Sequence, residues 1–110
     1  MDAASILELE PIIYNEFVID TKSFEAFHQD QRLQLTLTEF KILYVLLSRP
    51  GMVCTREQLL DQINGDIHLL DRNIDVHISS LRKKIFNGKS IIQTIRGLGY
   101  RLSRDEFRTI

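Results

Sequence analysis

Two capping-box sequences determine where helices can begin in this chain. Thr36-Leu-Thr-Glu39 and Thr55-Arg-Glu-Gln58 each place a threonine three residues before a Glu or Gln. In such a box the hydroxyl accepts a hydrogen bond from an unpaired helical amide, while the later side chain reaches back to the threonine amide. Apolar residues follow the first box at a helical period until Pro50-Gly51, and the second until Asn64-Gly65. The sequence therefore predicts two consecutive helices in the middle of the chain.

A third helix is predicted over about residues 72–86, with Asp71 as its N-cap and Asn87-Gly88 at its end. One side of this helix is a narrow apolar stripe with the spacing i, i+4, i+7 and i+11, formed by Ile74, Ile78, Leu81 and Ile85. The opposite stripe contains hydrogen-bonding residues, namely Asn73, His77, Ser80 and Lys84, with Arg72, Ser79, Arg82 and Lys83 beside it. We expect the apolar stripe to face the core and the polar stripe to face outward.

Short strands are predicted on both sides of the helices. Before them, residues 6–10, 16–20, 23–28 and 32–36 alternate apolar and polar types, with a hairpin turn at Asp30-Gln31. After them, residues 90–95 and 100–102 form two strands joined through Arg96-Gly-Leu-Gly99, whose glycines can adopt positive φ. The predicted fold class is α+β, with an N-terminal antiparallel sheet, three helices and a C-terminal β-hairpin.

Charge is distributed unevenly along the chain. The net charge is −1, but residues 1–71 contain five Lys or Arg and twelve Asp or Glu residues, whereas residues 72–104 contain eight Lys or Arg and one acid, Asp75. The basic end coincides with the third helix and the hairpin. A winged helix-turn-helix needs this order, because its last helix enters the major groove and its hairpin lies beside the DNA backbone. An ordinary solvated helix face is the simpler interpretation, and the neighbouring basic hairpin weighs against it.

Length and motifs disfavour several other classes of protein. The 110 residues fit one domain over 1–110, with a core over about residues 6–103. The longest apolar run, residues 42–47, is far too short to span a membrane, so a cytoplasmic location is expected. Cys54 is the single cysteine, and the three histidines, His28, His68 and His77, are scattered, so we expect no disulfide, metal site or other cofactor. An enzyme is not expected, because P-loop, nucleophile-elbow and paired-carboxylate motifs are absent.

Five segments occur in an order and at spacings typical of one family. They are Leu35-Thr-Leu-Thr-Glu-Phe40, Arg49-Pro-Gly51, Thr55-Arg-Glu-Gln-Leu-Leu60, Arg72-Asn-Ile-Asp-Val-His-Ile-Ser-Ser-Leu-Arg-Lys-Lys84 and Thr94-Ile-Arg-Gly-Leu-Gly-Tyr-Arg101. Together they resemble the OmpR/PhoB-type winged-helix effector domain of bacterial response regulators. The resemblance implies a sheet packed on three helices, a C-terminal wing, and sequence-specific binding of double-stranded promoter DNA by a transcription regulator. It also implies a receiver domain of a two-component system, which these 110 residues do not include.

The resemblance assigns roles to individual positions. The third helix resembles the recognition helix, with DNA-facing positions at Arg72, Asn73, His77, Ser79, Ser80 and Arg82. Thr94 resembles a phosphate contact, and Arg96 resembles the wing arginine that enters the minor groove, where a narrow A·T-rich groove attracts a guanidinium. Residues Asp66, Ile67, His68, Leu69 and Leu70 lie where this family meets RNA polymerase. Two copies are expected to bind tandem half-sites as a homodimer.

The lysines add to this basic surface independently of the resemblance. We expect Lys83 and Lys84, together with Lys89, Arg101 and the arginines of the helix, to contact backbone phosphates. If about four to six phosphates are neutralised, the logarithm of the binding constant should fall with the logarithm of the salt concentration at a slope of roughly −4 to −5.

Two serines distinguish this recognition helix from many relatives. Arginines are common in the family at the positions of Ser79 and Ser80. Serine is shorter and lacks the forked donor that pairs with guanine O6 and N7. We therefore expect specificity to depend more on Asn73, His77, the wing arginine and DNA shape.

Asp75 is expected to form an ion pair inside the domain, because a free carboxylate on this surface would repel phosphate. Arg56 is the candidate partner.

The same basic face allows a second function, in which the winged helix docks an acidic protein partner. Binding of single-stranded nucleic acid is a weaker third interpretation, because the basic face lacks the aromatic platforms on which unpaired bases stack.

Overall fold

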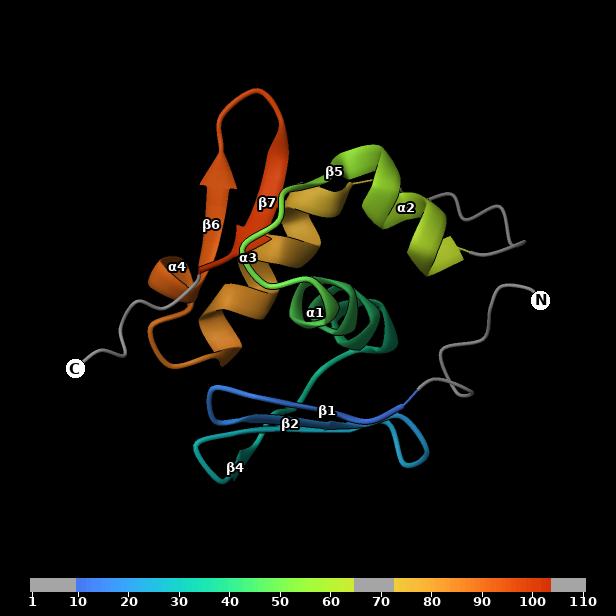
Figure 1. Cartoon of the computed structure of the whole chain (residues 1–110), viewed down its shortest axis with the longest axis vertical. Coiled ribbons are helices and arrows are strands. Elements are labelled where there is room, and N and C mark those ends of the chain that lie inside the picture. The colour runs from blue at the N-terminus through green and yellow to red at the C-terminus, as the bar shows by residue number, and fades with distance from the viewer. Residues whose placement is uncertain (1–9, 65–72, 104–110) are drawn as a thin grey trace.

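The computed structural model describes residues 10–64 and 73–103. A central helix, α1 (Leu37–Ser48), separates two parts of the molecule (Figure 1). On one side lies an antiparallel sheet of strands β1 (Ile12–Tyr14), β2 (Phe17–Asp20), β3 (Glu25–His28) and β4 (Gln31–Arg32), in that order. On the other side lie α2 (Arg56–Asn64), α3 (Ile74–Lys84), α4 (Gly88–Ile91) and a second sheet of β5 (Cys54–Thr55), β7 (Gly99–Leu102) and β6 (Ile92–Ile95), also given in spatial order. This architecture confirms the predicted α+β winged-helix fold.

The N-terminal sheet differs in detail from its prediction. The turn between β3 and β4 is Gln29-Asp30, one residue earlier than predicted, because both residues adopt positive φ and His28 pairs with Gln31. Strand β4 ends at Arg32 instead of Thr36, since Thr36 is already the N-cap of α1. The predicted strand at residues 6–10 lies almost entirely outside the described residues, and β1 was missed.

Both predicted capping boxes are confirmed. The Glu39 amide donates to Thr36 Oγ1 at 3.1 Å, and the Thr36 amide donates to Glu39 Oε1 at 3.0 Å. At the start of α2, the Gln58 amide donates to Thr55 Oγ1 at 3.0 Å, and the Thr55 amide donates to Gln58 Oε1 at 2.9 Å. Each box therefore satisfies amides at the helix start that would otherwise lack an intrahelical partner.

The apolar stripe of α3 is buried as predicted, with Ile74, Ile78, Leu81 and Ile85 between 0% and 3% exposed. The prediction for its start was wrong: the N-cap is Asn73, whose Oδ1 accepts from the Val76 amide at 3.2 Å, while Asp71 lies outside the described residues. The prediction for its end was too long, because α3 stops at Lys84.

The short helix α4 occupies part of the segment predicted as a strand from residue 90. Gly88 begins it at a close backbone approach, because a Cβ there would lie 2.1 Å from the Arg82 carbonyl oxygen. The Asn87 carbonyl accepts hydrogen bonds from the Ser90 and Ile91 amides, which closes the helical turn before β6 begins at Ile92.

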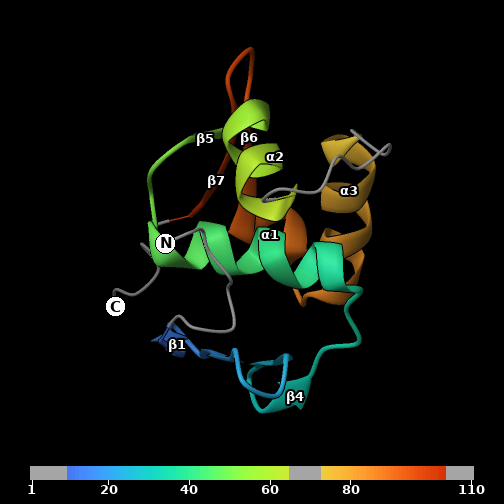
Figure 2. The same cartoon turned by 90° about the vertical axis from the view of Figure 1, so that its right-hand side faces the viewer.

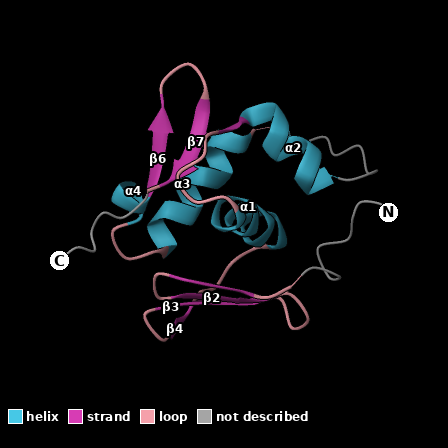
Figure 3. Ribbon diagram, viewed as in Figure 1, coloured by secondary structure: helices cyan, strands magenta, loops and turns pink. Residues whose placement is uncertain are grey.

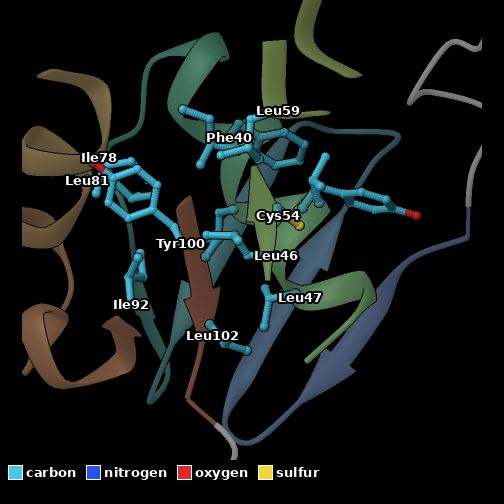
Figure 4. Close-up of a cluster of buried hydrophobic side chains, with 14 of the residues drawn as sticks. Phe40, Leu46, Leu47, Cys54, Leu59, Ile78, Leu81, Ile92, Tyr100 and Leu102 are labelled. Atoms are coloured by element: carbon cyan, nitrogen blue, oxygen red, sulfur yellow. The ribbon is translucent and has the colours of Figure 1, made fainter. Parts of the chain in front are cut away.

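The core lies between α1 and the elements around it. Figure 4 shows side chains from α1, α2, α3 and the β6–β7 hairpin converging on one cluster. Its most completely buried members include Ile42, Leu43, Leu46, Leu59, Ile78, Leu81, Ile92 and Leu102. Cys54 is also fully buried, and burial raises the pKa of its thiol, which agrees with a role as a small core residue. Because α3 packs on this cluster along one side, its other side is available for a different role.

Candidate nucleic-acid interface

Helix α3 and the β6–β7 hairpin, the wing, lie on the side of α1 opposite the N-terminal sheet. Figure 2 shows α2 and α3 next to each other, with the wing tip beyond them, and Figure 3 shows the wing as two magenta strands rising beside these helices. The Leu98 amide donates to the Ile95 carbonyl at 2.8 Å, and Gly97 has φ of 78°. These are features of a type II turn, which places Arg96 at the exposed corner of the wing.

Arg82 joins α3 to the wing. Its Nε and Nη2 atoms donate to the Ile92 carbonyl at 2.9 and 2.6 Å, and Nη2 also donates to Thr94 Oγ1 at 2.8 Å. Since β6 is at the edge of its sheet, this guanidinium satisfies a carbonyl on the wing strand itself. The forked geometry of arginine suits this arrangement, because one planar group reaches two acceptors. Arg82 therefore fixes the position of the wing relative to α3.

Tyr100 in β7 is the centre of a second junction. Its hydroxyl donates to Asp75 Oδ1, and the Arg56 Nε atom donates to the same oxygen at 2.8 Å. The Arg56 and Arg82 guanidiniums lie 5.4 and 5.6 Å from the centroid of the Tyr100 ring, within the range of cation–π attraction. The Arg56–Asp75 pair that was hypothesised from sequence is thus present. Together with Tyr100, this pair connects α2, α3 and the wing.

This junction shifts the protonation equilibria of its members. Hydrogen bonds from Tyr100 and then from Arg56 lower the pKa of Asp75. Burial and the hydrogen bond to Asp75 raise the pKa of Tyr100. Both shifts favour an ionised Asp75 beside a neutral Tyr100, which keeps the hydrogen bond and the ion pair intact around neutral pH.

A third junction connects α3 to α1. Glu39 is only 2% exposed, and it accepts hydrogen bonds from Ser80 Oγ at 2.6 Å and from Lys84 Nζ at 2.7 Å. Burial raises the pKa of Glu39, but the hydrogen bonds from Lys84, Ser80 and the Thr36 amide together outweigh it, so that its pKa lies below the ordinary value. The carboxylate is therefore charged and fully engaged between the two helices.

The predicted site residues fall into three groups in the structure. Asn73, Ser79, Lys83, Thr94 and Arg96 are exposed, and His77 is half-buried. The half-buried side chains Ser80, Arg82 and Lys84 turn toward α1 or the wing, so the polar stripe of α3 is not uniformly directed outward. Arg72 and the segment Asp66, Ile67, His68, Leu69 and Leu70 lie outside the described residues.

Sequence reasoning missed several residues of this surface. Val76 is 56% exposed on α3, and Leu98 is 56% exposed at the wing tip. They were not considered because the sequence analysis selected polar and charged types as candidate contacts. Glu39 was assigned only as a cap, and Tyr100 only as a strand residue, because the sequence carries no signal for their contacts with α3.

Residues 10–64 and 73–103 contain no group of three His, Cys, Asp or Glu side chains placed to hold a metal ion. Within the same ranges, no helix combines the length and apolarity needed to cross a bilayer.

Helices α1, α2 and α3, the exposed polar side chains on α3 and a wing tied to that helix define a winged helix-turn-helix DNA-binding domain. Comparison with known proteins gives the family: residues 30–102 match the domain described as "Transcriptional regulatory protein, C terminal". The chain belongs to the OmpR/PhoB-type DNA-binding domains of bacterial response regulators, which are transcription regulators and not enzymes.

Individual relatives agree with this assignment. The phosphate regulon transcriptional regulatory protein PhoB of Escherichia coli (strain K12) is 39% identical over 88 residues, covering 77% of this chain and 38% of that protein. The DNA-binding domain of CpxR from E. coli has a TM-score of 0.71 and 35% identity, covering 86% of this chain and 96% of that one. The DNA-binding domain of AdeR, solved in complex with an intercistronic region, has a TM-score of 0.71 and 37% identity, covering 84% and 98% of the two chains. The chain thus spans about two fifths of the PhoB sequence and nearly all of the isolated DNA-binding domains.

Proposed function

We propose that this domain regulates transcription by placing α3 in the major groove of double-stranded DNA and the wing residue Arg96 in the adjacent minor groove. The observation that carries the proposal is the Arg82 junction, which joins α3 to β6 through the Ile92 carbonyl and Thr94. It holds α3 and the wing in one fixed arrangement in the absence of DNA. Such preorganisation lowers the entropy that binding has to overcome. The AdeR domain was solved in complex with an intercistronic region and the Klebsiella pneumoniae RstA domain in complex with RstA box, which supports DNA binding by a domain of this fold.

The exposed residues supply the proposed contacts. Asn73 and Ser79 offer hydrogen bonds to base edges or phosphates, Lys83 offers a cation to the backbone, and His77 is placed between them on the same helix. Val76 adds an exposed apolar group that suits a thymine methyl. Arg72 precedes this helix in the sequence and is proposed as a further phosphate contact.

The wing supplies contacts beside the groove. Thr94 is exposed on β6, so its hydroxyl can donate to a phosphate while it accepts from Arg82. Arg96 stands at the corner of the turn with no bulky neighbour at Gly97, where a Cβ would meet open space. A narrow minor groove attracts such a guanidinium.

Binding to duplex DNA can be tested by titration against labelled DNA from upstream of its own gene, with a mixed-sequence duplex as competitor. The expected slope of the binding constant against salt, on logarithmic axes, remains roughly −4 to −5. An affinity that does not change with salt would contradict the proposed phosphate contacts. The absence of any specific shift at low salt would favour the alternative function, docking of an acidic protein partner.

Two further partners are proposed from the family alone. RNA polymerase is proposed to meet the segment that contains Asp66, Ile67, His68, Leu69 and Leu70, and two copies are proposed to occupy tandem half-sites. A footprint on one half-site and on two half-sites would test the second proposal. Equal affinity per site on both DNAs would contradict cooperative binding as a homodimer.

A further inference from the structure

The Glu39–Ser80–Lys84 junction places two predicted DNA contacts inside the domain. One carboxylate oxygen, Oε1, accepts from the Thr36 amide at 3.0 Å and from Lys84 Nζ at 2.7 Å. The other, Oε2, accepts from Ser80 Oγ at 2.6 Å. The carboxylate therefore accepts from three donors, one at the start of α1 and two in the second half of α3.

The two sides of the junction differ in how firmly they are held. The Glu39 side chain is 3% exposed, and the capping box fixes it at the first turn of α1. The Lys84 side chain is 32% exposed and extends from the last residue of α3. Because a buried carboxylate without a partner is strongly unfavourable, Lys84 is held on Glu39 instead of moving freely in solvent.

We propose that Glu39 is a positioning residue for the recognition helix and that it withdraws the charge of Lys84 from DNA binding. This inference rests on the proposed function and makes it more specific. It assigns Ser80 and Lys84 to holding α3 on α1, while Lys83, the exposed neighbour of Lys84, contacts phosphate. The short side chain of Ser80 fits here because its hydroxyl reaches Glu39 Oε2 directly and leaves Oε1 to Lys84.

The Glu39–Lys84 ion pair that holds α3 on α1 is tested first, in the absence of DNA. Lys84→Met should lower the midpoint of urea unfolding, because it leaves the Glu39 charge buried and unpaired. The double variant Glu39→Gln/Lys84→Met should recover much of this loss, since Gln retains the capping hydrogen bond and carries no charge. If the second substitution gives no recovery, the ion pair is not made in solution and the inference is overturned.

The withdrawal of charge is tested by salt titrations of DNA binding, with Lys83→Met as the matched control. Removing one phosphate contact changes the logarithmic slope by about 0.9. We expect this change in Lys83→Met and an unchanged slope in Glu39→Gln/Lys84→Met. A slope that is shallower by the same amount in the double variant would show that Lys84 contacts phosphate, and would overturn the inference.

The role of Ser80 is tested by the sequence preference of a Ser80→Ala variant. Each base pair of a bound site is changed in turn, and the relative affinities are compared with those of the unsubstituted protein. We expect the preferences to agree within about twofold, because a contact that discriminates bases contributes far more than this. A preference that relaxes about tenfold at one base pair would show that Ser80 reads DNA. If the unsubstituted domain binds no DNA, the proposed function fails. The urea experiment still decides whether the Glu39–Lys84 ion pair holds α3 on α1.

Discussion

Replacing Arg82 with lysine tests whether this residue is a structural junction or a simple phosphate contact. Both side chains carry one positive charge, so a phosphate contact through charge alone would be retained. The junction would not be retained, because a single ammonium group cannot reproduce the three hydrogen bonds to Ile92 and Thr94. The substitution therefore separates the two roles without changing the net charge.

The expected loss follows from the contacts. Losing one or two hydrogen bonds lowers the free energy of unfolding by about 1–2 kcal/mol, and weakening the contact with the Tyr100 ring adds about 0.5 kcal/mol. A total of about 2 kcal/mol lowers the Tm of a domain of this size by on the order of 10 °C. Arg82 is half-buried, so this total already assumes partial solvent compensation.

The assay is thermal unfolding followed by circular dichroism, without DNA, and then DNA binding at several salt concentrations. We expect Arg82→Lys to unfold at a lower temperature and to bind DNA more weakly, with an unchanged salt slope. Lys83→Arg is the control, because Lys83 is exposed and its replacement retains the charge. An Arg82→Lys protein with the original Tm and affinity would refute the junction and restore Arg82 to a purely electrostatic role.

Three further predictions concern the wing and the N-terminal sheet. Gly99→Ala should destabilise the domain by about 3 kcal/mol or more, since its Cβ would lie 2.1 Å from the Cys54 carbonyl oxygen. Gly97→Ala has open space around its Cβ but a φ of 78°, so it should destabilise the domain by only about 1–2 kcal/mol. Equal urea midpoints for the two variants would contradict this reasoning. Burial lowers the pKa of His28, so the contribution of His28 to stability should be complete above an unfolded-state pKa of 6.5 and should decrease as the pH falls below that value. Unfolding experiments between pH 5 and pH 8 should show this loss of stability. The loss should be absent in His28→Phe. Arg96→Ala should weaken binding mainly to sites with A·T-rich minor grooves, whereas equal losses on all sequences would reduce Arg96 to a phosphate contact.

The helices were predictable because their signals are local. The two threonine capping boxes and the period of Ile74, Ile78 and Leu81 each depend on residues within a few turns of one another. Short elements such as β1 and β5 were missed, since two or three residues carry no readable period and depend on pairing with distant strands. The start of α3 was misplaced because Asp71 and Asn73 are both good N-caps, and the sequence alone does not choose between them.

The residue types of the site could be predicted from the sequence, but not the direction in which each side chain points. Helical spacing places Asn73, His77, Ser80 and Lys84 on one stripe, yet Ser80 and Lys84 turn to Glu39, which lies about forty residues earlier in the chain. Arg82 likewise turns to a carbonyl on β6. Only the three-dimensional packing of α1, α3 and the wing reveals these acceptors. The Arg56–Asp75 pair was found because an acid alone in a basic segment requires a partner.

The fold places the acidic N-terminal sheet and the basic α3–wing surface on different sides of α1. The N-terminal sheet carries acidic residues such as Glu16, Asp20 and Glu25, and it lies on the far side of α1 from the wing (Figure 1). The basic segment lies on the opposite side together with α2, which contributes Glu57 and Asp61, so the separation along the sequence is kept in space between the sheet and the α3–wing surface. Such a field turns the attractive side of a protein toward a polyanion during diffusion. Helix α1 is the boundary between the two sides, and Glu39 and Lys84 meet there as a neutralised pair. The same contact that holds α3 on α1 therefore also neutralises one cation, Lys84, at the edge of the positive side.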